Sequence, residues 1–303
     1  MNRKIAIAMV MGVAFALPCA AQIALPIQVL PVMAKLSGSA DTDWMSSLSI
    51  SNIGQERADV TALFFRENQN NIPLLGPSHE FSIGPGETLT ADDVLGEWFP
   101  AEGNTKGFLV VVGEAEGSDE DPFMLTVAGR VFNNADPNAT YGQTVPSGVL
   151  GLMVAPGASN LPGVRSDDSV RSNVGVVNFS IFPLDVIITT FGADGMVLAS
   201  VNRQVRSFSL SQWSLSRLGV GTLSTPGRVE VQVDPDSITW DPCFGEEPDI
   251  DALQGIFMTY VSRVDQVTGD AEFILGQSDW YNYLALCEET PSVIPAHLLF
   301  SAR

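Results

Sequence analysis

The chain has 303 residues, with 35 acidic against 15 basic side chains and a formal net charge of −20 at pH 7. Such an acidic surface repels phosphate backbones, so we expect no nucleic-acid partner. It favours solubility, tolerance of salt and binding of cations. The length is sufficient for two domains of ordinary size.

The first 21 residues, MNRKIAIAMVMGVAFALPCAA, are typical of a secretory signal peptide. A basic start at Arg3 and Lys4 precedes an apolar run over residues 5–17, and small residues precede Gln22. This run is shorter than the roughly 20 residues that span a bilayer, although a membrane anchor is the alternative. No later stretch is long and apolar enough to cross a membrane. We therefore expect an extracellular or cell-surface protein that begins at Gln22, with the periplasm as the alternative location.

An ungapped repeat relates residues 48–65, LSISNIGQERADVTALFF, to residues 174–191, VGVVNFSIFPLDVIITTF. Each copy predicts a strand, a short polar or Pro-containing turn and a second strand, and alternation with period two is clear in the first strand. An Asn that ends a strand can bond its own backbone and open the turn. The coincident residues include Asn52 with Asn178, Asp59 with Asp185, Val60 with Val186 and Phe65 with Phe191.

The correspondence continues with gaps through GFLVVV and GRVEVQV, and then through FMLTVAGRVFNN and GIFMTYVSRVDQ. Each half offers about seven short strands, regular turn signals and almost no helix. We predict an all-β fold with two tandem immunoglobulin-like β-sandwich domains, over residues 22–147 and 148–285, and a C-terminal tail over residues 286–303. The alternative is one large barrel or jelly roll whose internal similarity is accidental.

Four stretches carry a family resemblance: LPVMAKLSGSADTDWMSSLSISN, LPGVRSDDSVRSNVGVVN, YGQTVP and YVSRVDQVTGDAEF. With them the chain resembles the repeated immunoglobulin-like modules of exported bacterial proteins, many of which are uncharacterised. The resemblance covers most of the mature chain and implies a secreted or surface β-sandwich with no catalytic residue. The first copy departs from the second, because Met45 and Ser47 stand where the second has Arg171 and Asn173.

Two cysteines, Cys243 and Cys287, remain once the signal peptide is removed. Outside the cell, an even pair predicts one disulfide bond. The bond would close a loop of about 45 residues and contribute up to about 4 kcal/mol in the chain-entropy description. Two buried free thiols are the alternative.

The chain lacks the motifs of common hydrolases. The nucleophile motif G-x-S-x-G is absent, and His79-Glu80 begins a zinc motif in which Ile83 occupies the place of the second His. His297 is the only other histidine, so a Ser-His or Cys-His pair is difficult to build. We therefore predict that the protein is not an enzyme.

Two acidic stretches are the predicted metal sites, because oxygen-rich loops can hold Ca²⁺ with several carboxylates. By the repeat, both stretches join equivalent strands. The candidate ligands are Glu116, Asp119 and Asp121 in the first stretch, and Asp241, Glu247, Asp249 and Asp251 in the second. Neither stretch has the spacing of an EF-hand loop, and a solvated acidic loop is the alternative.

An aromatic cluster, formed by Trp280, Tyr281 and Tyr283, is the remaining candidate binding site. On a strand, Tyr281 and Tyr283 share one face and can stack on a sugar or a protein side chain. Packing beneath the C-terminal tail is the alternative.

These patterns predict an exported, non-catalytic binding or structural module at or outside the bacterial cell surface. Its expected partner is an unidentified protein or glycan, and calcium is the one cofactor to consider. The alternatives are a calcium-stabilised adhesin, and a carbohydrate-binding module or enzyme.

Overall fold

A computed structural model describes residues 27–38, 42–99, 101, 103–115, 125–136, 138, 140–149, 158–234, 237 and 257–278. Within these residues the chain is almost entirely β-strand in antiparallel sheets, with three very short helices. The predicted all-β class is therefore confirmed. The expected signal peptide (1–21) and C-terminal tail (286–303) lie outside the described residues.

The first half contains nine of the strands found in the described residues. They are β1 (Ile27–Ser37), β2 (Asp43–Asn52), β3 (Ala58–Arg66), β4 (Ser78–Ile83), β5 (Thr88–Ala91), β6 (Thr105–Ala115), β7 (Leu125–Asn133), β8 (Tyr141–Pro146) and β9 (Gly148–Val149). Two short helices, η1 (Pro73–Leu75) and α2 (Val94–Glu97), lie between strands.

The second half, over the described residues, contains nine further strands and one short helix, η3 (Leu215–Leu218). The strands are β10 (Ser159–Ser166), β11 (Val170–Asn178), β12 (Leu184–Phe191), β13 (Val197–Val205), β14 (Ser209–Ser214), β15 (Leu223–Val233), β16 (Phe257–Asp265), β17 (Ala271–Leu275) and β18 (Gln277–Ser278).

The two halves have the same strand order. In the first half, sheet 1 runs β5-β2-β7-β8 and sheet 2 runs β4-β3-β6-β1-β9; they join only where the end of β1 pairs with β2. In the second half, sheet 3 runs β14-β11-β16-β17 and sheet 4 runs β13-β12-β15-β10-β18. Each strand of one half therefore has a counterpart nine places along in the other, and α2 corresponds to η3.

Alternation along the strands places a core between the two sheets of each half. In the first half, Leu48 and Ile50 of sheet 1 join Ala62 and Phe64 of sheet 2 in one buried cluster. In the second half, the buried cluster between sheets 3 and 4 includes Val174, Val176, Val186, Ile188, Val229, Val231 and Val261.

This strand order differs from the immunoglobulin order. There the first strand lies beside the second, and the seventh beside the sixth. Here β1 lies beside β6 and β7 lies beside β2, and β10 and β16 repeat this arrangement in the second half. Relative to the immunoglobulin order, the first and seventh strands have exchanged sheets, and the fourth strand lies beside the third instead of the fifth.

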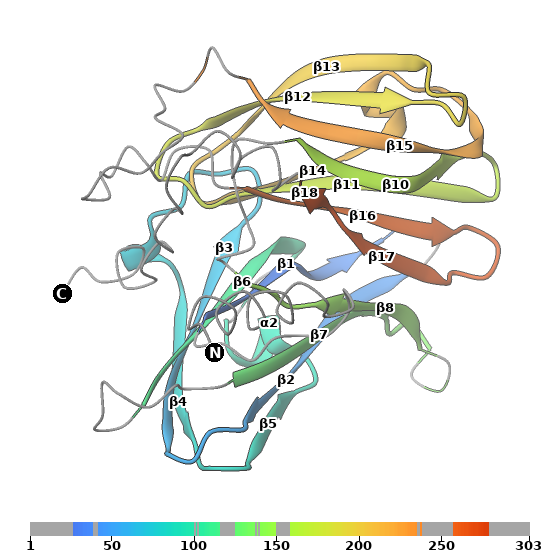
Figure 1. The fold of residues 1–303 in the computed structure, drawn as a ribbon. Coiled ribbons are helices and arrows are strands. Elements are labelled where there is room, and N and C mark those ends of the chain that lie inside the picture. The colour runs from blue at the N-terminus through green and yellow to red at the C-terminus, as the bar shows by residue number, and fades with distance from the viewer. Residues whose placement is uncertain are drawn as a thin grey trace, which may run out of the picture.

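The halves pack sheet against sheet, so that sheets 1, 2, 3 and 4 follow one another as layers (Figure 1). Between sheets 2 and 3, the ring of Phe65 stacks on Phe108 at 4.7 Å and on Phe208 at 5.8 Å. Phe179 meets Phe108 edge-on at 5.2 Å. Val177, Leu210 and Tyr260 of the second half belong to the first half's core cluster, so the two halves share one apolar interface.

Hydrogen bonds extend this interface at its edge. The connection from β3 to β4 lies along β14, where the Asn68 N–H donates to the Leu210 carbonyl (2.9 Å) and the Asn71 N–H donates to the Ser207 carbonyl (3.0 Å). The Asn71 side-chain amide also donates to the Phe208 carbonyl at 2.6 Å. These bonds join the first half to Leu210, near the start of β14, and to the two residues that precede the strand.

None of the helices in the described residues has the length and apolar character needed to cross a bilayer.

Candidate functional site

The residues predicted from the sequence as sites lie outside the described residues. This holds for Cys243 and Cys287, for the aromatic cluster of Trp280, Tyr281 and Tyr283, and for all the candidate calcium ligands. The ligand candidates are Glu116, Asp119, Asp121, Asp241, Glu247, Asp249 and Asp251. Within the part of the chain that is described, no three His, Cys, Asp or Glu residues gather in a way that would hold a metal ion.

The strands that flank the two acidic stretches are described, and they correspond to one another. The first stretch follows β6 and precedes β7, and the second follows β15 and precedes β16. At the start of β7, Leu125 pairs with Asn52, and at the start of β16, Phe257 pairs with Asn178. Both stretches thus return to the sheet beside the same repeated Asn.

Each repeated Asn is fully buried and closes the turn that follows its strand. The Asn52 side-chain amide donates to the carbonyls of Glu56 (2.8 Å) and Ile83 (3.0 Å), and its oxygen accepts from the Gly54 N–H (2.9 Å). Asn178 makes the corresponding bonds to Phe182, Val205 and Ser180. The shared Asn is therefore a structural corner, which accounts for its repetition.

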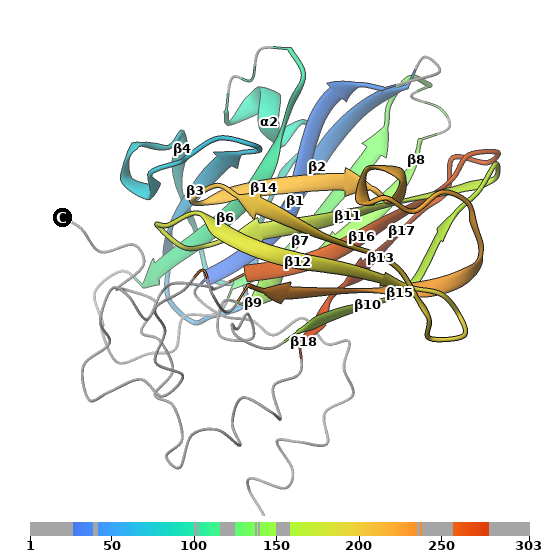
Figure 2. The same cartoon turned by 90° about the horizontal axis from the view of Figure 1, so that it is seen from above.

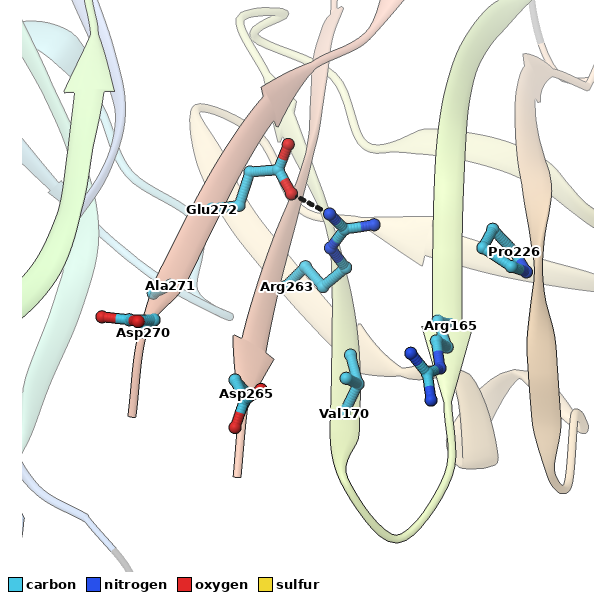
Figure 3. Close-up of a pocket in the computed structure, with 8 residues that line it drawn as sticks. All are labelled: Arg165, Val170, Pro226, Arg263, Asp265, Asp270, Ala271 and Glu272. Carbon is cyan, nitrogen blue, oxygen red and sulfur yellow. Dashed lines mark hydrogen bonds and ion pairs between the residues drawn. The ribbon is translucent and has the colours of Figure 1, made fainter. Parts of the chain in front are cut away.

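A hollow with charged walls lies at one end of the second half. It has a volume of about 300 Å³ and is lined by Arg165, Val170, Pro226, Arg263, Asp265, Asp270, Ala271 and Glu272. The β10–β11 turn, which passes from sheet 4 to sheet 3, and the β16–β17 hairpin form it, together with Pro226 of β15 (Figure 3). We refer to it as the hairpin pocket.

In the β10–β11 turn, the Asp167 carboxylate is held by several bonds. One carboxylate oxygen accepts from the Ser169 N–H (2.8 Å), the Ser169 hydroxyl (2.7 Å) and the Val170 N–H (3.0 Å), while the other pairs with Arg165 Nε at 2.5 Å. The hydrogen bonds from Ser169, with a smaller contribution from Arg165, hold the pKa of Asp167 well below its usual value. This carboxylate is committed to the turn.

The β16–β17 hairpin is organised in the same way. Asp265 accepts from the N–H groups of Val267 (2.8 Å) and Thr268 (2.9 Å), and those bonds, with Thr268 first, lower its pKa. Arg263 donates to the Gly163 carbonyl at 3.0 Å and forms an ion pair with Glu272. In Figure 3 the Asp270 side chain points away from both arginines.

The eight residues that line the hairpin pocket include two guanidinium and three carboxylate groups, but no Ser, Cys or His. Arg165, Arg263, Asp265 and Glu272 are bonded to groups of the same two turns or of β10. These contacts hold the two turns together, and we assign the pocket a structural role.

No family model matches the sequence, and no similar sequence was found among curated proteins.

A second feature becomes visible only from the strand pairing. Sheet 3 faces the first half with Val177 flanked by Leu210 and Met258. The counterpart in sheet 1 is Ser51, flanked by Thr88 and Thr126. Apolar side chains at the interface are thus replaced by hydroxyl groups on the outer face of sheet 1.

The facing pair of sheets follows the same rule. In sheet 2, Phe65 pairs with Phe108 and Leu63 with Val110. At the corresponding positions of sheet 4, Phe191 pairs with Arg228 and Thr189 with Glu230. The Arg228 guanidinium lies 3.7 Å from the centre of the Phe191 ring, so it covers the one aromatic side chain of this pair.

Sequence patterns did not predict the hairpin pocket or the polar outer faces of sheets 1 and 4. The VRSDDSV and DQVTGDA turns were visible, but their proximity depends on β11 pairing with β16. The contrast between apolar and polar residues at equivalent positions is visible in the sequence when alternate residues of the two aligned copies are compared.

Proposed function

We propose that this protein is an exported, non-catalytic binding or structural module at or outside the bacterial cell surface. It consists of two tandem β-sandwich units, over residues 22–147 and 148–285, that form a rigid pair. The immunoglobulin-like description applies only in the broad sense of two packed antiparallel sheets, since the order of the strands is different.

One observation carries the proposal: equivalent sheet faces are apolar where the two halves meet and polar at both outer ends. In stacked-repeat proteins, terminal units need such a polar outer face to remain soluble. A pair with two polar ends is a completed array. The apolar interface holds the two halves together, which makes the pair suited to spacing and presentation.

Export is tested by producing the full chain, with its own N-terminus, in a bacterium. We expect mass spectrometry to find a mature chain that begins at Gln22, outside the cytoplasm and accessible to protease added to intact cells or to their periplasm. Recovery of the uncleaved chain from the cytoplasm contradicts the export proposal. Turnover of any glycan by the purified mature chain contradicts the non-catalytic proposal.

A calcium-stabilised adhesin is the second candidate, because both acidic stretches connect equivalent strands. Thermal unfolding in excess calcium and then in chelator distinguishes it from a metal-free module. A ligand present at about 100 times its dissociation constant stabilises the folded state by about 2.7 kcal/mol. We expect that shift to disappear in the D119N/D121N/D249N/D251N variant if the adhesin is correct, and identical curves with and without calcium exclude it.

A further inference from the structure

Among the described residues, the strand β13 is an edge of sheet 4. In the sheet order it occupies the end position and pairs with β12 on one side only (Figure 1). It is nine residues long, against six for its counterpart β4. Because edge strands present unpaired N–H and C=O groups, a long edge is a template for pairing with another chain.

Proteins usually protect such edges with charged side chains, prolines or a covering loop. Residues 196–205, MVLASVNRQV, contain no proline and no acidic residue. The one charged side chain, Arg203, folds back on the main chain, where it donates to the carbonyls of Asn202 (2.9 Å) and Arg217 (2.7 Å). The strand therefore lacks an outward charge that would repel a partner.

Apolar side chains are exposed at one end of this edge. Met196, Val197 and Leu198 are 65%, 58% and 46% exposed. They form the only run of three among the nine large hydrophobic residues that are exposed in the described chain. Consecutive exposure of this kind marks an interaction surface more strongly than scattered single residues do.

Two other strand edges are partly covered or carry residues that oppose pairing. The β14 edge is bonded at Leu210 to the β3–β4 connection of the first half, as described above. The counterpart β4 carries Glu80 and follows Pro77, both of which oppose pairing. Of these edges, β13 is the long one that has no acidic residue and no proline, and that has exposed apolar residues at its end.

We propose that β13 is a self-association edge, along which a second copy of this chain pairs in antiparallel orientation around a two-fold axis. We infer a second copy as the partner. Two copies of this acidic chain repel one another over most of their surface, but along β13, which carries no carboxylate, they can approach. With Val201 at the middle of the strand, the apolar segment Met196–Leu198 of each copy lies against residues 204–206 of the other. Such a contact is isologous, so assembly stops at a dimer.

A matched pair of variants tests the proposal. Asn202 and Gln232 both flank Ile187, one on each side of β12, and both are exposed on the outer face of sheet 4. Only Asn202 lies on the edge. N202K and Q232K therefore add the same charge to the same face, but only N202K places like charges close together across the two-fold axis.

Sedimentation equilibrium of the mature full chain over a range of concentrations gives the readout. We expect a dimer for the wild type and for Q232K, and a dissociation constant at least about tenfold higher for N202K, which is about 1.4 kcal/mol. A wild type that remains monomeric at about 100 μM overturns the proposal. Equal weakening by N202K and Q232K overturns it as well.

Hydrogen exchange gives a second, mutation-free measurement. Amides of β13 should become more protected as the wild-type concentration rises, while those of β4 should not change. Protection of β13 that is independent of concentration contradicts the proposal even if N202K fails to fold. This inference concerns the partner of one strand edge and does not depend on the proposed export or on the non-catalytic role.

Discussion

Single residues fix the corners of this protein more than they provide chemistry. The buried Asn52 and Asn178 each satisfy several main-chain groups at the end of a strand, at positions related by the sequence repeat. Asp167 and Asp265 do the same for two turns between strands. Because main-chain groups must be paired when they are buried, these short polar side chains have a structural use that composition alone does not distinguish from binding.

Replacement of Asn178 by Ala is expected to lower the free energy of unfolding by about 2–3 kcal/mol, because buried carbonyl and N–H groups lose their partner. Urea denaturation measures this as a lower midpoint with an unchanged slope. N138A, at an exposed Asn whose bonds lie within one turn, is the control and should change stability by less than about 0.5 kcal/mol. Equal effects at the two positions contradict the corner role.

Asp167 predicts how stability depends on pH. Its pKa in the folded protein lies well below the ordinary value of 3.8, mainly because of hydrogen bonds from Ser169. The ionised carboxylate therefore stabilises the fold above about pH 4, and this contribution is lost as the pH falls below that value. In urea denaturation, the stability difference between wild type and D167N should shrink from about pH 6 to about pH 2. A difference that is constant over this range contradicts the prediction.

At the scale of strands, the two halves repeat an irregularity as well as an order. The register of β1 against β6 shifts between Leu30 and Met33, and that of β10 against β15 shifts between Pro162 and Val164. A glycine follows each shift on the partner strand: Gly107 pairs with Met33, and Gly227 with Val164. A side chain at either glycine would collide with a neighbouring carbonyl, that of Phe65 or Phe191.

G107A and G227A are each expected to cost about 1–3 kcal/mol, because the added methyl group overpacks a main-chain contact. Thermal unfolding should show a lower midpoint for both variants. G221A provides the control, since a methyl group there meets no atom within 4 Å, and its midpoint should remain near that of the wild type. Unchanged midpoints for G107A and G227A would show that the strands relax around the methyl group.

At the scale of the molecule, the apolar layer between sheets 2 and 3 determines whether the halves act as one body. Phe65 is completely buried in it and stacks on rings from both halves. Tyr260 is also buried at this layer, where desolvation and then the Glu67 carboxylate raise its pKa. Its hydroxyl donates to Gln212 at 3.2 Å, so it stays neutral and paired.

We expect the wild type to unfold in one cooperative transition, because the halves share a core cluster. F65A should lower stability by about 3–5 kcal/mol and separate the transition into two. F191A changes the equivalent residue on the outer face of sheet 4. It should keep a single transition and lower the free energy of unfolding by about 1 kcal/mol. Differential scanning calorimetry measures both, and two transitions in the wild type would contradict the shared core.

The sequence by itself determined the β class, because alternation and turn residues are local properties of the chain. It also predicted the strand–turn–strand repeat around Asn52 and Asn178. The bonds of those side chains to Ile83 and Val205 could not be predicted, because those partners come from later strands that approach only in the fold.

The tertiary structure alone decided which strands share a sheet and which faces meet. Strand order depends on pairing between residues far apart in the sequence, such as Ile27 with Val112, and period two is the same for either order. The tertiary structure therefore placed β1 beside β6 and brought two turns together around Arg165 and Arg263. It also placed Val177 at the interface between the halves and Ser51 on an outer face. Local pattern shows that a residue is apolar or polar; the neighbour it meets is a property of the whole chain.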